Sequence, residues 1–250
     1  MKNYYYNFNL IVALFRKEFL YVKRYKFNTI FGIVFMGIMF ILISKSLKQT
    51  NDAFFFYAYV TWLLMVTNYS SIMNNLTNEL SLGTLEQLFL SSRNFIATLL
   101  FRSIIIFFFS FFQIIFLTIL IKLIDGTYDF SMVNRFLKLL PQILLGMMSI
   151  WGISFIVSAF MLKYRNVNSL YNAVSTVLFA GISYMVNKIY FLKYILPFGY
   201  TSFLIQKNEV YFIDNIFIII NSMFYLIVGI LIFNFYLKRS KHYGSLAKHS

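Results

Sequence analysis

Residues 96–121 read IATLLFRSIIIFFFSFFQIIFLTILI, and Arg102 is the only charged residue in this stretch. A transmembrane α-helix needs about 20 consecutive, mostly apolar residues to cross the hydrocarbon core of a bilayer. The stretch is therefore predicted to be a membrane-spanning helix. Five further segments have enough length and apolar content, so the sequence predicts an all-α polytopic membrane protein. The six predicted spans are residues 27–44, 53–73, 96–121, 139–162, 169–186 and 215–237.

The composition of the whole chain agrees with a lipid environment. Its 250 residues are 60% hydrophobic and 12% charged, and the mean hydropathy is +0.73. A soluble domain is about 45–50% apolar and about 25% charged. The charged side chains are too few to cover the surface of a soluble protein of this size. We therefore expect residues 1–250 to form one transmembrane domain.

The distribution of basic residues predicts the orientation. An even number of spans places both termini on one side, and that side holds 14 of the 22 lysines and arginines. Because basic residues collect in cytoplasmic segments, both termini are predicted to be cytoplasmic. The formal net charge of +14 then reflects membrane orientation, and we expect no nucleic-acid partner. The frequent Lys, Asn, Ile, Phe and Tyr are typical of an AT-rich genome, which favours a bacterial plasma membrane.

The segment before the first span is predicted to be an amphipathic helix at residues 8–26, with its basic and apolar residues on opposite faces. Such a helix lies in the membrane interface and contacts lipid. Glu18 falls within the apolar arc, where a carboxylate is costly. It either has a protein partner or snorkels to the surface. The basic face consists of Arg16, Lys17, Lys23 and Arg24.

The predicted outer segment 187–214 contains an interrupted apolar run. Pro197 and Gly199 are expected to break a helix in its middle, and the segment is too short to cross and return. We predict a re-entrant helix–turn–helix, which is tolerated where protein or water satisfies its backbone groups.

Catalytic and metal-binding chemistry is not expected in this chain. It has no cysteine, and its two histidines, His242 and His249, lie in the C-terminal tail. The phosphate-loop pattern G-x-x-x-x-G-K-[ST], the G-x-S-x-G pattern and the H-E-x-x-H pattern are all absent. The acidic residues lie in loops or near interfaces, which argues against an ion-coupled carrier.

A few polar residues interrupt the predicted spans. Asn68, Gln113 and Asn221 lie in the second, third and sixth spans. They are candidates for a weakly polar substrate path. The alternative is interhelical hydrogen bonding, which contributes about 0.6 kcal/mol for each bond on average.

The predicted cytoplasmic loop 74–94 carries the most informative motif, Glu79 followed by Gly83-Thr84-Leu85-Glu86. Apolar residues recur there at helical spacing, which is typical of a short docking helix and also of an ordinary surface helix. These apolar residues are Leu82, Leu85 and Phe89.

This motif resembles that of ABC-2 type transporter permeases, in the branch that exports drugs, peptides or lipids. The basic N-terminal helix, the six spans and the predicted re-entrant segment match the layout of the same family. The resemblance implies that residues 79–89 form a coupling helix seated in a separate ATPase. It also implies that residues 8–26, with Arg16-Lys17-Glu18, form a connecting helix.

Other properties follow from the resemblance alone. ATP and Mg²⁺ would bind two copies of a partner ATPase and not this chain, and a second permease copy or a paralogue would complete a dimer. The substrate would be amphipathic or hydrophobic, such as a peptide toxin. Two departures from the family pattern are the uncharged Leu80-Ser81-Leu82 and the Ser91-Ser92-Arg93 that stands where proline is common. An ATP-independent immunity or scaffold protein and a small secondary carrier are the alternatives.

Overall fold

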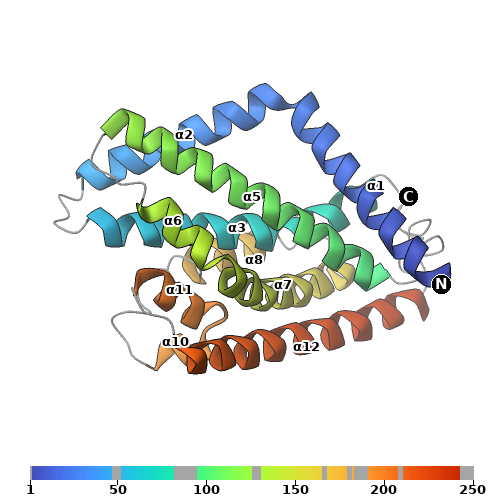
Figure 1. Cartoon of the computed structure of the whole chain (residues 1–250). Helices are drawn as coiled ribbons and strands as arrows, with labels where there is room; N and C mark the ends of the chain where they lie inside the picture. Colours follow the sequence, from blue (N-terminus) through green and yellow to red (C-terminus); the bar gives the residue numbers. More distant parts are fainter. Residues whose placement is uncertain are drawn as a thin grey trace.

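The computed structural model describes residues 2–46, 52–81, 95–125, 131–164, 168–178, 182, 191–207 and 211–242. Within these residues 95% of the chain is helical and no strand occurs (Figure 1). The all-α class that the sequence predicts is therefore confirmed. In chain order the elements are α1 (Lys2–Arg24), α2 (Lys26–Ser46), α3 (Asp52–Ser81), α5 (Phe95–Asp125), α6 (Ser131–Lys138), α7 (Leu140–Lys163), α8 (Asn168–Ala173), the π-helical turn η1 (Val174–Leu178), α10 (Leu192–Ile195), α11 (Gly199–Gln206) and α12 (Phe212–His242).

Four of the described helices are long and apolar enough to cross a membrane, which is consistent with an integral membrane protein. They coincide with the first, third, fourth and sixth predicted spans. The second predicted span lies in α3, which has 30 residues but is more polar. The fifth falls on α8, η1 and residues outside the described part of the chain. Both stay predictions. The four apolar stretches are Lys26–Ile43, Phe95–Ile124, Leu140–Leu162 and Phe212–Arg239.

The helix α3 lies at the centre of the bundle, where it packs against α2, α5, α7, α11 and η1. A row of residues spaced four apart along α3 is at most 1% exposed. Each step of four residues turns by about 40°, so this buried row winds from one side of the helix to the other. Burial on several sides explains how α3 can carry more polar residues than its neighbours, since other helices and not lipid surround them. The row consists of Phe56, Val60, Leu64, Asn68, Ile72 and Leu76.

The end of α3 differs from the sequence prediction, which placed a loop from residue 74. The helix continues to Ser81. Hydropathy falls at Asn74 and Asn75, yet Asn75 is only 5% exposed and Leu76 is 1% exposed. Packing against the bundle thus extends the helix beyond its apolar stretch.

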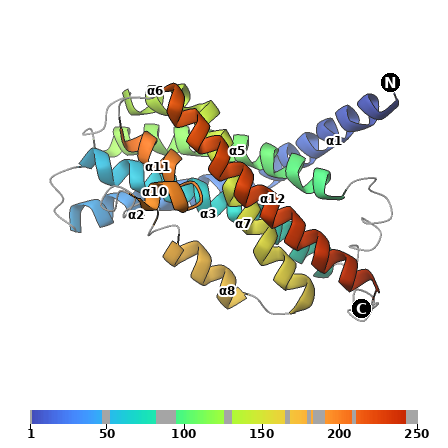
Figure 2. The ribbon, with the colours of Figure 1, turned by 90° about the horizontal axis from the view of Figure 1, so that it is seen from below.

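The closest helix pair is α7 with α12, and two glycines allow it. The space of a Cβ atom at Gly152 is occupied by backbone atoms of Tyr225, and a Cβ at Gly229 would overlap the backbone of Gly152. The two backbones are therefore in direct contact, as small residues permit at membrane helix crossings. Figure 2 shows the two helices lying side by side along much of their length.

The helices α7 and α12 run in the same direction. Near their starts, the Gln142 amide donates to Asn215 Oδ1 over 3.3 Å. Near their ends, the rings of Phe160 and Tyr236 have centroids 5.8 Å apart. The chain that leaves α7 must therefore return along the bundle before α12 begins.

The helices α1 and α2 meet at a bend near Tyr25 (Figure 1). Backbone bonds continue through the bend, from Tyr25 N–H to Tyr21 O over 2.9 Å and from Thr29 N–H to Tyr25 O over 3.0 Å. Thus α1 departs from the line of α2 without an intervening loop, which suits a helix that leaves a span to lie in an interface.

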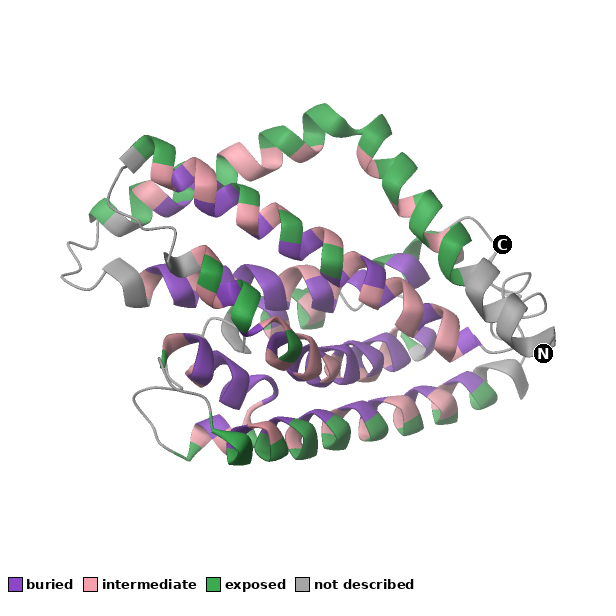
Figure 3. Ribbon diagram, in the orientation of Figure 1, coloured by how far each residue is buried: buried purple, intermediate pink, exposed green. Residues whose placement is uncertain are grey.

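Large apolar side chains remain exposed on α2 and on one face of α12 (Figure 3). Phe27 and Phe31 on α2 are 81% and 72% exposed, and Phe224 and Leu231 on α12 are 61% and 62% exposed. Apolar faces of this extent are unfavourable in water, so lipid or another protein is expected to cover them.

Candidate functional site

The residues of the predicted coupling motif lie at the connection between α3 and α5. Glu79 belongs to the last turn of α3. Leu82, Gly83, Thr84, Leu85, Glu86 and Phe89 lie outside the described residues. The flanking ends are packed: Thr77 Oγ1 lies 3.6 Å from Met161 Sδ of α7, and the rings of Phe95 and Phe233 have centroids 6.3 Å apart.

The expected protein partner of Glu18 is within the chain. Arg102 of α5 donates from Nε to Glu18 Oε1 over 2.9 Å. The side chains are 18% exposed for Arg102 and 15% exposed for Glu18. The ion pair places a neutralising charge beside each ion, which lowers the cost of holding both in an apolar environment. It ties α1 to α5, the helix that follows the predicted coupling motif.

The face that α1 turns toward the bundle is narrow. Leu14, Glu18 and Val22 are half-buried, whereas the neighbouring residues from 11 to 25 are mostly exposed. The spacing of four residues places these three side chains in one row, so Glu18 is at its centre. Arg16 and Lys17 are exposed and stay available to lipid or a partner.

Asn68 joins three helices in the core. Its Nδ2 atom donates to Leu64 O over 2.9 Å and to Ser110 Oγ of α5 over 3.2 Å. Trp151 of α7 donates from Nε1 to Asn68 Oδ1 over 3.4 Å. Asn68 is fully buried, so its geometry favours interhelical hydrogen bonding over a substrate path.

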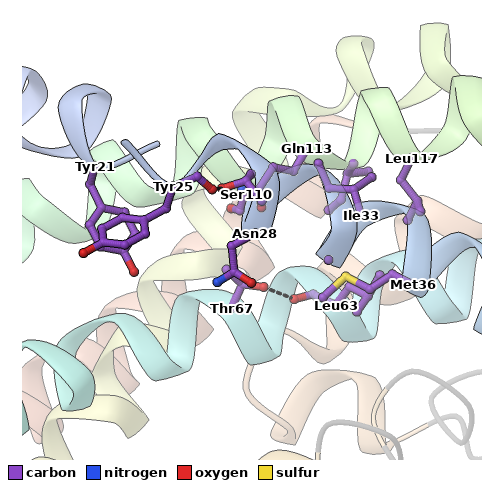
Figure 4. A pocket seen from close by; sticks show the side chains of 13 residues that line it. Tyr21, Tyr25, Asn28, Ile33, Met36, Leu63, Thr67, Ser110, Gln113 and Leu117 are labelled. Carbon is purple, nitrogen blue, oxygen red and sulfur yellow. Dashed lines mark hydrogen bonds between the residues drawn. The ribbon is translucent and has the colours of Figure 1, made fainter. Parts of the chain in front are cut away.

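Gln113 lines a cavity of about 200 Å³ between α1, α2, α3 and α5 (Figure 4). Of the three polar span residues, it is the one that opens into this space. The lining consists of Tyr21, Tyr25, Asn28, Thr29, Gly32, Ile33, Met36, Leu63, Thr67, Ser110, Gln113, Ile114 and Leu117.

Asn221 supports the helix–turn–helix formed by α10 and α11. Its Nδ2 atom donates to Tyr194 O over 2.9 Å and to Leu196 O over 3.3 Å. Tyr225, one turn further along α12, donates to Ile195 O over 2.8 Å. The last carbonyl groups of a helix have no hydrogen-bond partner within the helix. The side chains of Asn221 and Tyr225 donate hydrogen bonds to carbonyl groups at the end of α10.

The turn between α10 and α11 contains Pro197, and Gly199 begins α11, so the helix breaks where the sequence predicts. Phe198 between them has φ of 60°, a left-handed conformation, and is buried. The Gly199 N–H donates to Leu196 O over 3.0 Å. A Cβ atom at Gly199 would lie 3.0 Å from Lys193 O, so glycine permits the close approach of the two short helices.

Three charged residues that the sequence placed in outer segments are built into the packing. Lys193 is 4% exposed, and its Nζ lies 4.0 Å from the ring centroid of Phe203. Asp214 is 6% exposed and accepts from the Tyr200 hydroxyl. The guanidinium of Arg135 lies 4.8 Å from the ring centroid of Tyr57. The many aromatic residues of segment 187–214 were the available signal for the contacts of Lys193 and Asp214.

The described residues contain no group of three His, Asp or Glu that could hold a metal ion. Comparison with known proteins gave no matching family model, no matching curated protein and no matching solved structure. The function must therefore be argued from the residues and their geometry.

Proposed function

We propose that this chain is the permease subunit of an ABC-2 type ATP-binding cassette exporter, driven by a separate ATPase. The observation that carries the proposal is the motif of Glu79 and Gly83-Thr84-Leu85-Glu86, which connects two long packed helices. This chain would have no catalytic residues, and ATP and Mg²⁺ would bind two copies of the ATPase. A second permease copy or a paralogue would complete the transporter.

The packing around the motif suits a mechanical connection. A partner that grips residues 79–89 would displace the end of α3, and the rest of α3 is buried among five other elements. The same displacement would act on the start of α5, which the Glu18–Arg102 ion pair ties to α1. Packed helices have discrete arrangements, so a small shift at this end can be carried along the bundle.

The parallel α7 and α12 support the proposed number of six spans, and the cytoplasmic side of the termini rests on the distribution of basic residues. Because these two helices run in the same direction, residues 164–211 must cross the bundle an odd number of times. The short α10 and α11 cannot span a bilayer. The return is therefore assigned to the span at residues 169–186, with α10 and α11 as the re-entrant segment.

The proposed substrate is amphipathic or hydrophobic, such as a peptide toxin, a drug or a lipid, exported across a bacterial plasma membrane. Asn68 and Asn221 are engaged in hydrogen bonds between elements. Gln113 is the polar residue that we assign to contact with a ligand, because its side chain lines a cavity with both polar and apolar walls.

The proposal is tested by the ATPase activity that purifies with the tagged chain after co-expression with its ATPase. We expect Gly83→Leu and Glu86→Lys to abolish assembly or to uncouple ATP hydrolysis from transport. Gly126→Leu, in the predicted outer loop, is the matched control and should leave both unchanged. If the wild-type chain functions without any ATPase, the chain is an ATP-independent immunity or scaffold protein and the proposal is wrong.

A further inference from the structure

The cavity beneath the α1–α2 bend is polar at one end and apolar at the other, as Figure 4 shows. Along α2, the lining changes from Asn28 near the bend to Met36 further along the helix. Along α5, it changes from Gln113 to Leu117. The polar end consists of Tyr21, Tyr25, Asn28, Thr29, Thr67, Ser110 and Gln113, and the apolar end of Ile33, Met36, Leu63, Ile114 and Leu117.

This gradient follows the expected depth in the membrane. The bend is where α2 enters its apolar stretch, since Lys26 is both the first residue of α2 and the first of the candidate span. Along α2, the polar end of the cavity is therefore at the start of the apolar stretch, whereas Gln113 of α5 lies 18 residues beyond the start of its own apolar stretch at Phe95. An amphiphile aligned with the lipids would match both ends of the cavity at once.

Two amides at the polar end are open to a ligand. Among the described residues, neither Asn28 nor Gln113 has a hydrogen-bond partner for its side chain. A polar group that faces hydrocarbon without a partner is costly. Ester carbonyl and phosphate oxygens of a lipid would accept from these amides.

Exposed basic residues lie at the α1–α2 bend, beside the cavity. Lys23, Arg24 and Lys26 are exposed at the bend, and the Arg24 guanidinium lies 5.8 Å from the ring centroid of Tyr25, which lines the cavity. No lining residue is acidic, and the nearby carboxylate of Glu18 is engaged by Arg102. The mouth thus favours an anion.

We propose that this cavity binds one anionic phospholipid. The phosphate contacts Arg24 and Lys26, the glycerol esters lie between Asn28 and Gln113, and the acyl chains continue along the exposed apolar face of α2. A cavity of about 200 Å³ exceeds the ~10–15 Å³ that one water needs, yet it encloses only the glycerol region of a lipid. Assignment to the cytoplasmic leaflet rests on the proposed topology, whereas the binding itself does not.

The test is lipid retention by the full chain. The purified protein is equilibrated in nanodiscs with equal phosphatidylglycerol and phosphatidylcholine, re-extracted in mild detergent, and examined by native mass spectrometry. We expect one retained phosphatidylglycerol. Arg24→Gln and Lys26→Gln should each lower the preference for phosphatidylglycerol about fivefold. Each basic residue near a membrane surface contributes about 1 kcal/mol to the attraction of an anionic lipid, which corresponds to a factor of about five.

Removal of the amide should act differently. Gln113→Leu is expected to lower retention of both lipids about threefold and to leave the preference between them unchanged, because the ester region is common to both. Lys238→Gln and Asn234→Leu, on α12 away from the cavity, are the matched controls and should have no effect. Equal retention of both lipids by the wild type, or an unchanged preference in the Arg24→Gln/Lys26→Gln double variant, would overturn the proposal.

Discussion

Loss of the Glu18–Arg102 ion pair should release α1 from the bundle. Arg102 is seven residues after the start of α5, which places it about 10 Å along the helix axis. Loss of one partner costs about 3–5 kcal/mol for a fully buried pair and under about 1 kcal/mol for an exposed pair. With side chains 15–18% exposed near a helix end, we expect Glu18→Gln to weaken the docking of α1 by about 2 kcal/mol.

The assay is amide hydrogen exchange of α1 in nanodiscs. A loss of about 2 kcal/mol corresponds to exchange that is about 30-fold faster where docking provides the protection. Lys17→Gln changes the adjacent, exposed charge and should leave the exchange rate unchanged. The absence of cysteine in the chain also allows a unique spin label on α1 to report the same detachment as a distance change.

The double variant decides whether the effect comes from the pair. If Glu18 and Arg102 stabilise each other, the Glu18→Gln/Arg102→Gln variant should lose clearly less than the sum of the two single losses, because the remaining uncompensated charge is also removed. Strict additivity would refute the ion pair as the reason that α1 docks.

Three further perturbations follow from the packing. Gly152→Ala should lower the thermal unfolding midpoint by about 5 °C or more, because its Cβ would overlap the backbone of Tyr225. Gly32→Ala should leave the midpoint unchanged, because no atom lies within 4 Å of the added Cβ. Equal effects of the two substitutions would contradict the backbone contact between α7 and α12. Asn68→Leu should lower the free energy of unfolding by about 1 kcal/mol, because two interhelical hydrogen bonds are lost, and should leave the choice of substrate unchanged. An altered substrate range would show instead that Asn68 lines the substrate path. Asn221→Leu should speed hydrogen exchange in residues 191–207 about fivefold, and unchanged exchange would mean that α10 needs no support from α12.

The sequence predicted the long helices well, because hydropathy over about 20 residues depends little on the details of packing. It also predicted the break at Pro197 and Gly199, where local backbone chemistry decides the conformation. The partner of Glu18 could be anticipated only in part. Arg102 stands out as the one charge in its apolar stretch, but nothing in the spacing of residues 18 and 102 reveals that they meet.

Features that depend on contacts between distant segments were not accessible in this way. The end of α3 at Ser81 depends on burial of Leu76 against other helices. The contact of Gly152 with Gly229 depends on the register of two helices that are far apart in sequence. Lys193 falls in the predicted outer segment 187–214, and nothing in its sequence position reveals that its charge lies against aromatic rings.

The most direct test of an ATP-driven permease is the accessibility of the coupling motif. A single cysteine introduced by Thr84→Cys is labelled in membrane vesicles of known orientation, with and without the co-expressed ATPase. The account predicts labelling from the cytoplasmic side alone, and strong protection when the ATPase is present. Labelling from the outer side, or cytoplasmic labelling that the ATPase does not change, would contradict it.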